Sequence, residues 1–210
     1  MKIVFISLDK QWIEFAKLNG YETYLGKIQD YTPNQETTNV YYISSPSSLC
    51  FMDRGIDKVY SKIMFKNIET IIETKIKKLG FKTKLGRPFL PIGKAIVTKT
   101  DSLHPKGTSY LITSPSMLTP QDVSKTPNAF LAIIAVIQLL KEYKHFIKDT
   151  DELIIPSICC GSGKMNSLIS IQQIIKALES DVSKMNLDLK KIIQVQPNVY
   201  ENSEWKTIKQ

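Results

Sequence analysis

The sequence predicts an α/β protein, in which buried strands alternate with helices, and three observations lead to this class. Residues 40–43 read V-Y-Y-I, a β-branched and aromatic run that is typical of a buried strand. A loop of small residues follows, and from Ile56 the apolar residues recur at three- and four-residue spacing, as on a helix. Residues 152–166 repeat the order of strand, glycine turn and helix. Repeated units of this kind indicate an α/β fold.

The first forty residues are expected to contain two strands and one helix. The strands are predicted at 2–8 and 21–28 because both stretches are rich in apolar and aromatic residues. The helix between them, at 12–18, is expected to end at Gly20, since glycine is common just past a helix. A polar loop then leads to the strand at 40–43.

The middle of the chain is expected to hold a long helix, two strands and a buried helix. The helical pattern that begins at Ile56 continues to residue 79 and stops at Gly80. Strands are predicted at 92–98 and 110–113. Pro127 is predicted at the first position of the next helix. Because that helix is apolar nearly all round, we expect it to be buried.

The end of the predicted core consists of a strand at 152–156 and a helix at 166–182. A chain of 210 residues is long enough to form one α/β domain with a substantial core. We therefore expect a domain over residues 1–185 and a C-terminal extension over 186–210, with a candidate edge strand at 192–195.

The charge of the chain raises nucleic acid as a partner. The formal net charge is +8, from 28 Lys and Arg against 20 Asp and Glu, and such an excess suits a polyanion. However, Arg54 and Arg87 are the only arginines, and the lysines are scattered along the chain. No zinc-finger spacing or sustained basic region is present, so nucleic-acid binding is kept as an alternative and is not favoured.

The cysteines and the apolar segments indicate an intracellular protein. Cys50, Cys159 and Cys160 are odd in number and contain no C-x-x-C pair, which argues against a disulfide framework and a zinc site. No stretch reaches the roughly 18 apolar residues of a membrane span, and the start of the chain does not resemble a signal peptide. We expect a cytoplasmic or nuclear monomer without a metal ion or cofactor.

The two loops that follow the strands at 40–43 and 152–156 are candidate anion sites. Backbone amides at a helix start lack internal partners and lie at the positive end of the helix dipole. Gly55 and the glycines at 161 and 163 would let the main chain approach a phosphate closely. If the two strands are neighbours, the loops would face one another across a diphosphate.

With both loops considered, the sequence resembles the macro domain family, which binds ADP-ribose. The family pattern N-A-A-N-x-x-L-x-G-G-G-G-V-D aligns without a gap with residues 44–57. Its G-D-I pattern aligns with residues 29–31, and its F-P-A-I-S-T-G pattern aligns with residues 155–161. The resemblance covers roughly residues 20–182.

The resemblance implies a three-layer α/β/α sandwich with a mixed central sheet and a ligand cleft at the strand ends. It assigns Asp30 to the adenine amino group and the Tyr31 amide to the adenine ring. From the residues alone, Asp30 is equally suited to capping loop amides. The other expected ligand-binding residues are Ser47, Asp53, Arg54, Gly55, Ile56, Ser114, Cys160, Gly161, Ser162, Gly163 and Lys164.

Departures from the family pattern bear on catalysis. The asparagine that positions a water or the ribose in hydrolytic members is here Ser47, which has a shorter side chain. Asp53 places a negative charge near the expected diphosphate, and Arg54 or Lys164 would have to offset it. Asp57 lies in the first turn of its helix, where it acts either on the ligand or on the helix dipole. Ser47 and Asp57 are thus the candidate catalytic residues.

The sequence therefore predicts a divergent macro domain that recognises ADP-ribose, or slowly processes its derivatives, with ADP-ribose or an ADP-ribosylated macromolecule as partner. If the protein is an enzyme, the expected activities are an ADP-ribose 1″-phosphate phosphatase or an ADP-ribosyl hydrolase. Two alternatives stay open. One is a scaffold module with a decayed pocket, and the other is nucleic-acid binding driven by charge.

Overall fold

The computed structural model describes residues 1–83, 85–101 and 107–181, and these form one layered α/β domain around a six-stranded sheet. The strand order is β2-β1-β6-β3-β5-β4. All neighbouring strands are parallel except β4, which runs antiparallel to β5, so the sheet is mixed as expected. The strands are β1 (Lys2–Ser7), β2 (Glu22–Leu25), β3 (Asn39–Ser44), β4 (Ile96–Lys99), β5 (Thr108–Thr113) and β6 (Glu152–Pro156).

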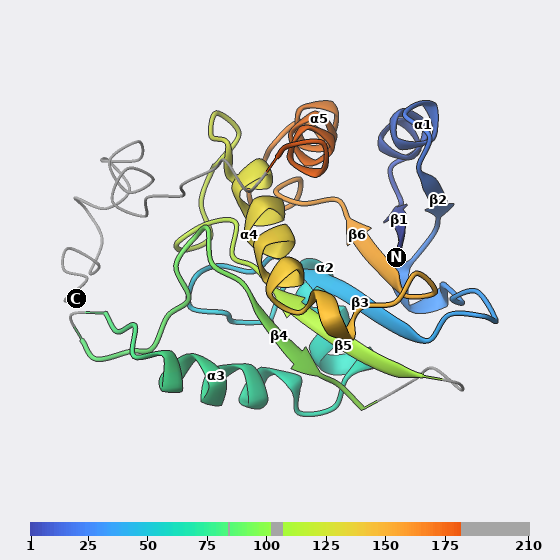
Figure 1. Ribbon diagram of the computed structural model, residues 1–210. Helices are drawn as coiled ribbons and strands as arrows, with labels where there is room; N and C mark the ends of the chain where they lie inside the picture. The colour runs from blue at the N-terminus through green and yellow to red at the C-terminus, as the bar shows by residue number, and fades with distance from the viewer. Residues whose placement is uncertain (84, 102–106, 182–210) are drawn as a thin grey trace.

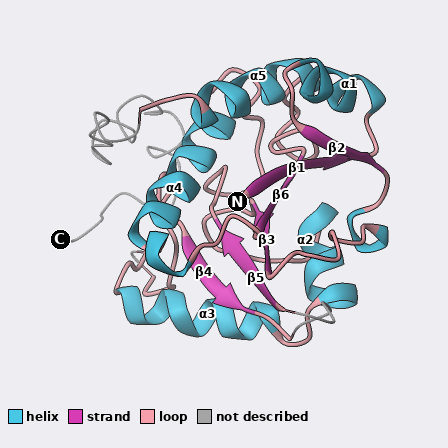
Figure 2. Cartoon of the chain, turned by 45° about the vertical axis from the view of Figure 1, so that its right-hand side comes forward, coloured by secondary structure: helices cyan, strands magenta, loops and turns pink. Residues whose placement is uncertain are grey.

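Helices cover both faces of this sheet, which gives the three layers that the sequence predicted (Figures 1 and 2). The helices are α1 (Lys10–Leu18), α2 (Gly55–Val59), α3 (Ile68–Leu79), α4 (Asn128–Glu142) and α5 (Ser167–Leu178), with short turns η1 (Ile28–Asp30), η2 (Tyr60–Met64) and η3 (Lys144–Phe146). One core joins α1, α4 and α5 to the sheet, and the other joins α2, η2 and α3 to its opposite face.

The central strands supply alternate side chains to the two cores. In β6, Leu153 and Ile155 belong to the α4–α5 core, whereas Ile154 belongs to the α2–α3 core. A strand covered on both faces reads as a continuous apolar run, which is why residues 152–156 were recognisable in the sequence. The strands at 40–43 and 152–156 are neighbours, because β3 pairs directly with β6, so the condition under which their loops would face one another is met.

Three expected elements differ in the structure. The predicted continuous helix at 56–79 is broken: α2 runs into the π-helical turn η2, the chain extends at Phe65, and α3 starts after Asn67, whose φ is 58°. Asparagine tolerates this left-handed conformation better than most residues, so it can separate two helices that share one apolar pattern. The strands predicted at 21–28 and 92–98 are shorter than expected.

Pro127 precedes α4 as its N-cap instead of occupying the first helical position. The candidate strand at 192–195 lies outside the described residues. Within the described part of the chain, no helix has the length and apolar character needed to cross a bilayer.

Candidate functional site

A pocket of about 300 Å³ lies at the carboxyl ends of β3 and β6. This is the edge at which open α/β sheets place their ligands. The lining comes from three loops, which follow β3, β5 and β6. The lining residues are Ser45, Pro46, Ser47, Phe51, Asp53, Arg54, Gly55, Ile56, Asp57, Ser116, Met117, Pro120, Pro156, Ser157, Ile158, Cys159, Gly161, Ser162 and Gly163.

The wall beyond β3 is tied to the wall beyond β5 by hydrogen bonds that continue the parallel pairing of these strands. The Ser116 amide donates to the Pro46 carbonyl at 3.1 Å, and the Ser48 amide donates to the Met117 carbonyl at 2.7 Å. Ser47 and Met117 form a parallel bridge. These two walls of the pocket are therefore an extension of the sheet.

The wall beyond β6 is a tight turn that is fixed at its two ends. Cys159 and Lys164 have φ values of 65° and 53°, and the Met165 amide closes the turn by donating to the Cys159 carbonyl at 3.0 Å. A Cβ atom on Gly163 would lie 2.5 Å from that carbonyl oxygen, so only glycine fits there. A Cβ atom on Gly161 would meet nothing within 4 Å. The turn is thus packed at Gly163 and open at Gly161.

Asp57 is the titratable group that lines the inner part of the pocket. It lies in the first turn of α2, and its Oδ1 accepts a hydrogen bond from the Ser44 hydroxyl at 2.6 Å. Burial raises the pKa of Asp57 to about 7; the Ser44 hydrogen bond opposes this shift, and the charge of Asp53 adds to it. A carboxyl group with such a pKa can both accept and donate a proton near neutral pH.

The cysteines near the pocket are not activated nucleophiles. Cys159 is buried and lines the pocket, and burial raises the pKa of its thiol to about 12. Burial also raises the pKa of the Cys160 thiol. Nucleophilic cysteines have lowered pKa values, whereas the pKa values of both of these thiols are raised. The described residues contain no cluster of three or more His, Cys, Asp or Glu side chains placed to hold a metal ion.

Comparison with solved structures identifies the fold. The macrodomain of Mycobacterium tuberculosis DarG is similar with a TM-score of 0.51 and 18% identity, over 70% of this chain and 84% of that one. Thermosipho africanus DarTG in complex with ADP-ribose is similar with a TM-score of 0.51 and 15% identity, over 83% of this chain and 49% of that one. The chain has the macro domain fold. No protein-family model matches the sequence, and no curated protein matches it significantly.

The pocket brings together most of the residues that the sequence singled out in the two loops. The expected residues that line it are Ser47, Asp53, Arg54, Gly55, Ile56, Asp57, Gly161, Ser162 and Gly163. Ser47 is buried, and its main chain forms the bridge to Met117 described above. Asp53 and Arg54 are exposed at the rim, where Arg54 Nε lies 3.9 Å from Asp53 Oδ2.

Five expected residues lie outside the lining of this pocket: Asp30, Tyr31, Ser114, Cys160 and Lys164. Ser114 is fully buried behind it, with its hydroxyl donating to the Ala132 carbonyl at 2.9 Å. Asp30 is exposed in η1. The role of Asp30 and the other four residues in ligand binding stays a prediction.

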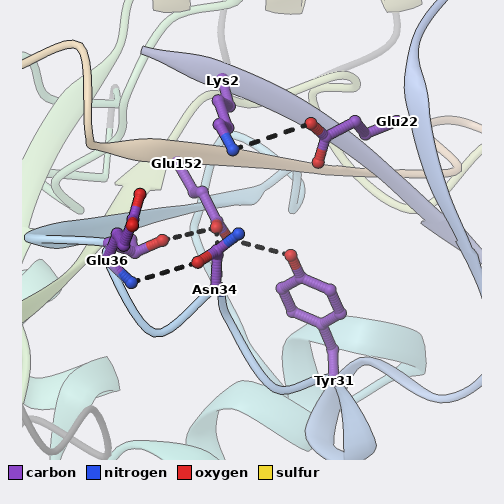
Figure 3. Close-up of polar contacts among 7 residues, drawn as sticks. Lys2, Glu22, Tyr31, Asn34, Glu36 and Glu152 are labelled. Atoms are coloured by element: carbon purple, nitrogen blue, oxygen red, sulfur yellow. Dashed lines mark hydrogen bonds and ion pairs between the residues drawn. The ribbon is translucent and has the colours of Figure 1, made fainter.

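Tyr31 points toward the opposite end of the sheet. Its hydroxyl donates at 2.8 Å to Glu152, the first residue of β6, as Figure 3 shows. The ring packs edge-on against Tyr24, with centroids 5.4 Å apart. The Tyr31 side chain therefore belongs to the core. Its expected contact with a ligand was through the backbone amide, which donates to the Ile28 carbonyl at 3.3 Å.

Sequence reasoning missed part of the lining. Phe51 is half exposed and lies in the loop after β3, in which it occupies a position that the family pattern leaves unspecified. The residues missed as individual contacts are Ser45, Pro46, Ser116, Met117, Pro120, Pro156, Ser157, Ile158 and Cys159. A signal was present for three of them, because Ser116, Met117 and Pro120 lie in a loop rich in Ser and Pro that follows the strand predicted at 110–113.

Proposed function

We propose that this pocket binds ADP-ribose or a related nucleotide. The observation that carries the proposal is the pair of loops beyond β3 and β6, which face one another across a 300 Å³ pocket on a macro domain fold. Gly161 leaves its side of the pocket open to the close approach of a phosphate. One structural neighbour, the Thermosipho africanus protein, holds ADP-ribose.

The helix starts around the sheet support a diphosphate beside α2. Asp9 and Asn166 cap α1 and α5, and their side chains accept hydrogen bonds from the first amides of those helices. The N-cap residues of α2, α3 and α4 make no such side-chain hydrogen bond in the described part of the chain, and of these three helices only α2 contributes residues to the pocket lining, among them Gly55 and Ile56. Amides without such a partner are donors for a bound anion. The nearby Arg54 offsets the charge of Asp53.

Slow hydrolysis of an ADP-ribose derivative is a second candidate function, and Asp57 favours it. A general base must be in a suitable protonation state at the working pH, and the pKa of Asp57 is raised to about 7. Asp57 would take a proton from an attacking water, while the Ser44 hydroxyl holds its carboxylate in place. Ser47, with one hydroxyl and a buried position, would contribute less to positioning that water.

Calorimetry with ADP-ribose, ADP and AMP tests the binding proposal. We expect ADP-ribose to bind most tightly, because it alone would fill both the diphosphate loops and the space beyond them. Gly161→Val should weaken its binding at least about tenfold, or about 1.4 kcal/mol, since the branched side chain would occupy the approach of the phosphate. Gly161→Ala is the matched control, because a Cβ atom there meets no protein atom within 4 Å.

Both variants should unfold at nearly the wild-type temperature. Failure of ADP-ribose to bind the wild type, or wild-type affinity in a folded Gly161→Val protein, would refute the proposed site.

Hydrolysis is tested on ADP-ribose 1″-phosphate and on an ADP-ribosylated protein. We expect slow turnover that Asp57→Asn lowers by about 10²-fold or more, in line with the usual contribution of general acid–base catalysis. Ser47→Ala should cost less. If both variants keep the wild-type rate, Asp57 is not a catalytic residue, and the site only binds its ligand.

A further inference from the structure

A second cavity, of about 370 Å³, lies beside the proposed nucleotide pocket, between the loop that follows β3 and one side of α3. Its lining is unlike that of the first pocket, because it contains two carboxylates and one guanidinium and no glycine. The lining residues are Leu49, Cys50, Phe51, Glu69, Thr70, Glu73, Ile76, Arg87 and Pro88.

Phe51 is the wall that the two cavities share. It lines both of them and is 50% exposed, although large apolar side chains are usually covered. A segment that is covalently attached to a ligand in the first pocket would pass over Phe51 and reach the second cavity. The aromatic ring would then contact the ligand on one side and the attached segment on the other.

The carboxylates of the second cavity come from adjacent turns of α3. Glu69 Oε1 accepts a hydrogen bond at 3.1 Å from the Met52 amide, which ties this carboxylate to the loop that also lines the first pocket. Glu73 forms an ion pair with Lys77 at 2.8 Å, in which both side chains are more than half exposed. Such a surface pair is worth little, so Glu73 is available to a competing cation.

These groups select a positive charge over a phosphate. Two carboxylates attract a cation, and an exposed aromatic ring adds a cation–π contact. Within the described residues Arg87, on another part of the lining, forms no ion pair, and its guanidinium is a donor for a main-chain carbonyl. Two carboxylates against one guanidinium leave the lining with one more negative than positive group, in a chain whose net charge is +8.

We propose that the second cavity binds a lysine or arginine side chain of a protein that carries ADP-ribose, next to the modified residue. The inference rests on the proposed nucleotide pocket and names the class of macromolecule that this pocket serves. ADP-ribose fills the first pocket, the modified segment crosses Phe51, and its cationic side chain lies between Phe51 and the two carboxylates. Arg87 donates to a carbonyl of the same segment.

The test compares three probes on the full chain: ADP-ribose, an ADP-ribosylated peptide with lysines flanking the modified residue, and the same peptide with glutamates. We expect the lysine peptide to bind about 5- to 10-fold more tightly than the glutamate peptide, as for one or two partly exposed ion pairs. The double substitution Glu69→Gln, Glu73→Gln should abolish this preference and leave the affinity for ADP-ribose unchanged. The glutamine at 69 keeps an acceptor for the Met52 amide.

Glu14→Gln is the matched control. Glu14 forms an exposed ion pair with Lys10 on α1, as Glu73 does with Lys77 on α3, but it lines neither cavity. It should keep the preference. The unmodified lysine peptide, titrated alone, should shift the amide NMR signals of Glu69 and Glu73 in the wild type and not in the double variant.

The possible failures separate the two proposals. Normal ADP-ribose binding without any preference for the lysine peptide would overturn the second cavity alone. Absence of ADP-ribose binding would refute the nucleotide pocket, and the unmodified peptide would still decide whether the second cavity takes a cation. Tighter binding of an ADP-ribosylated oligonucleotide than of the lysine peptide would also overturn the inference.

Discussion

A carboxylate lies at each end of the β3–β6 strand pair, and the two differ in the number of hydrogen bonds that they accept. At the amino end, Glu152 is buried and accepts hydrogen bonds from three donors: the Tyr31 hydroxyl, the Asn34 amide and the Thr37 hydroxyl (Figure 3 shows its contact with Tyr31). At the carboxyl end, Asp57 accepts its one side-chain hydrogen bond within the described residues from Ser44. Only the second carboxylate borders a pocket.

The difference separates a structural carboxylate from a functional candidate. Three donors replace the water that Glu152 loses on burial, so the charge is compensated within the fold. Asp57 has fewer donors, and its environment raises its pKa. A titratable group that lines an open pocket, and whose pKa is shifted by burial, is a candidate for acid–base chemistry.

Removing Glu152 should have the largest effect. Glu152→Ala leaves the Tyr31 and Thr37 hydroxyls and the Asn34 amide without their acceptor, which should lower the free energy of unfolding by about 2–4 kcal/mol. Urea denaturation measures the loss. Glu22→Gln is the control, because the ion pair of Glu22 with Lys2 in the same region is exposed and spans 4.0 Å (Figure 3). If both variants have wild-type stability, the contrast between the two ends is wrong.

Neutralising Asp57 should change the pH dependence of stability. Its folded-state pKa, about 7, lies above the unfolded value near 4, so the folded protein binds this proton more tightly. The resulting stabilisation is complete below about pH 4 and is lost as the pH rises to about 7. Because Asp57 is partly exposed, we expect a loss of about 1–2 kcal/mol over that range.

Asp57→Asn should remove this part of the pH dependence, so the difference in unfolding free energy between variant and wild type would change steadily from pH 4 to pH 7. Chemical denaturation at several pH values measures it. A difference that stays constant over that range would show that Asp57 titrates as an ordinary aspartate.

The smallest effect is expected at Asp30, and it tests how far the ligand-binding end of the sheet extends. Asp30 is exposed and outside the pocket lining, so a hydrogen bond from it to a ligand would be only partly shielded from water. Asp30→Ala should weaken ADP-ribose binding by about 1 kcal/mol and leave stability unchanged. Calorimetry on the folded variant gives the answer. An unchanged dissociation constant would confine the site to the loops beyond β3 and β6.

The sequence predicted the features that depend on local pattern. The bounds of β6 agree with the predicted strand, because the short apolar run at 153–155 is followed by Pro156 and a glycine turn. The similarity of the two loops suggested a shared ligand if their strands were neighbours, and β3 and β6 are paired in the structure. For the same reason, the residues expected in those loops largely line one pocket.

The sequence could not predict features that depend on contacts between distant segments. The break in the predicted helix at Asn67 depends on one residue whose left-handed conformation has no hydrophobic signature. The direction of Tyr31 depends on Glu152, which lies 121 positions away. The raised pKa of Asp57 depends on burial by loops that converge only in the folded chain.

Because the β3–β5 pairing continues into the pocket wall, this wall is ordered before a ligand binds. The amides of Ser48, Ser114 and Ser116 are held by carbonyl partners, so they should exchange with deuterium almost as slowly as those of the strands themselves. A loop that is ordered before the ligand arrives loses little conformational entropy on binding. Deuterium uptake in this wall should therefore be nearly the same with and without ligand, and the protection gained on binding should concentrate in the turn around Gly161.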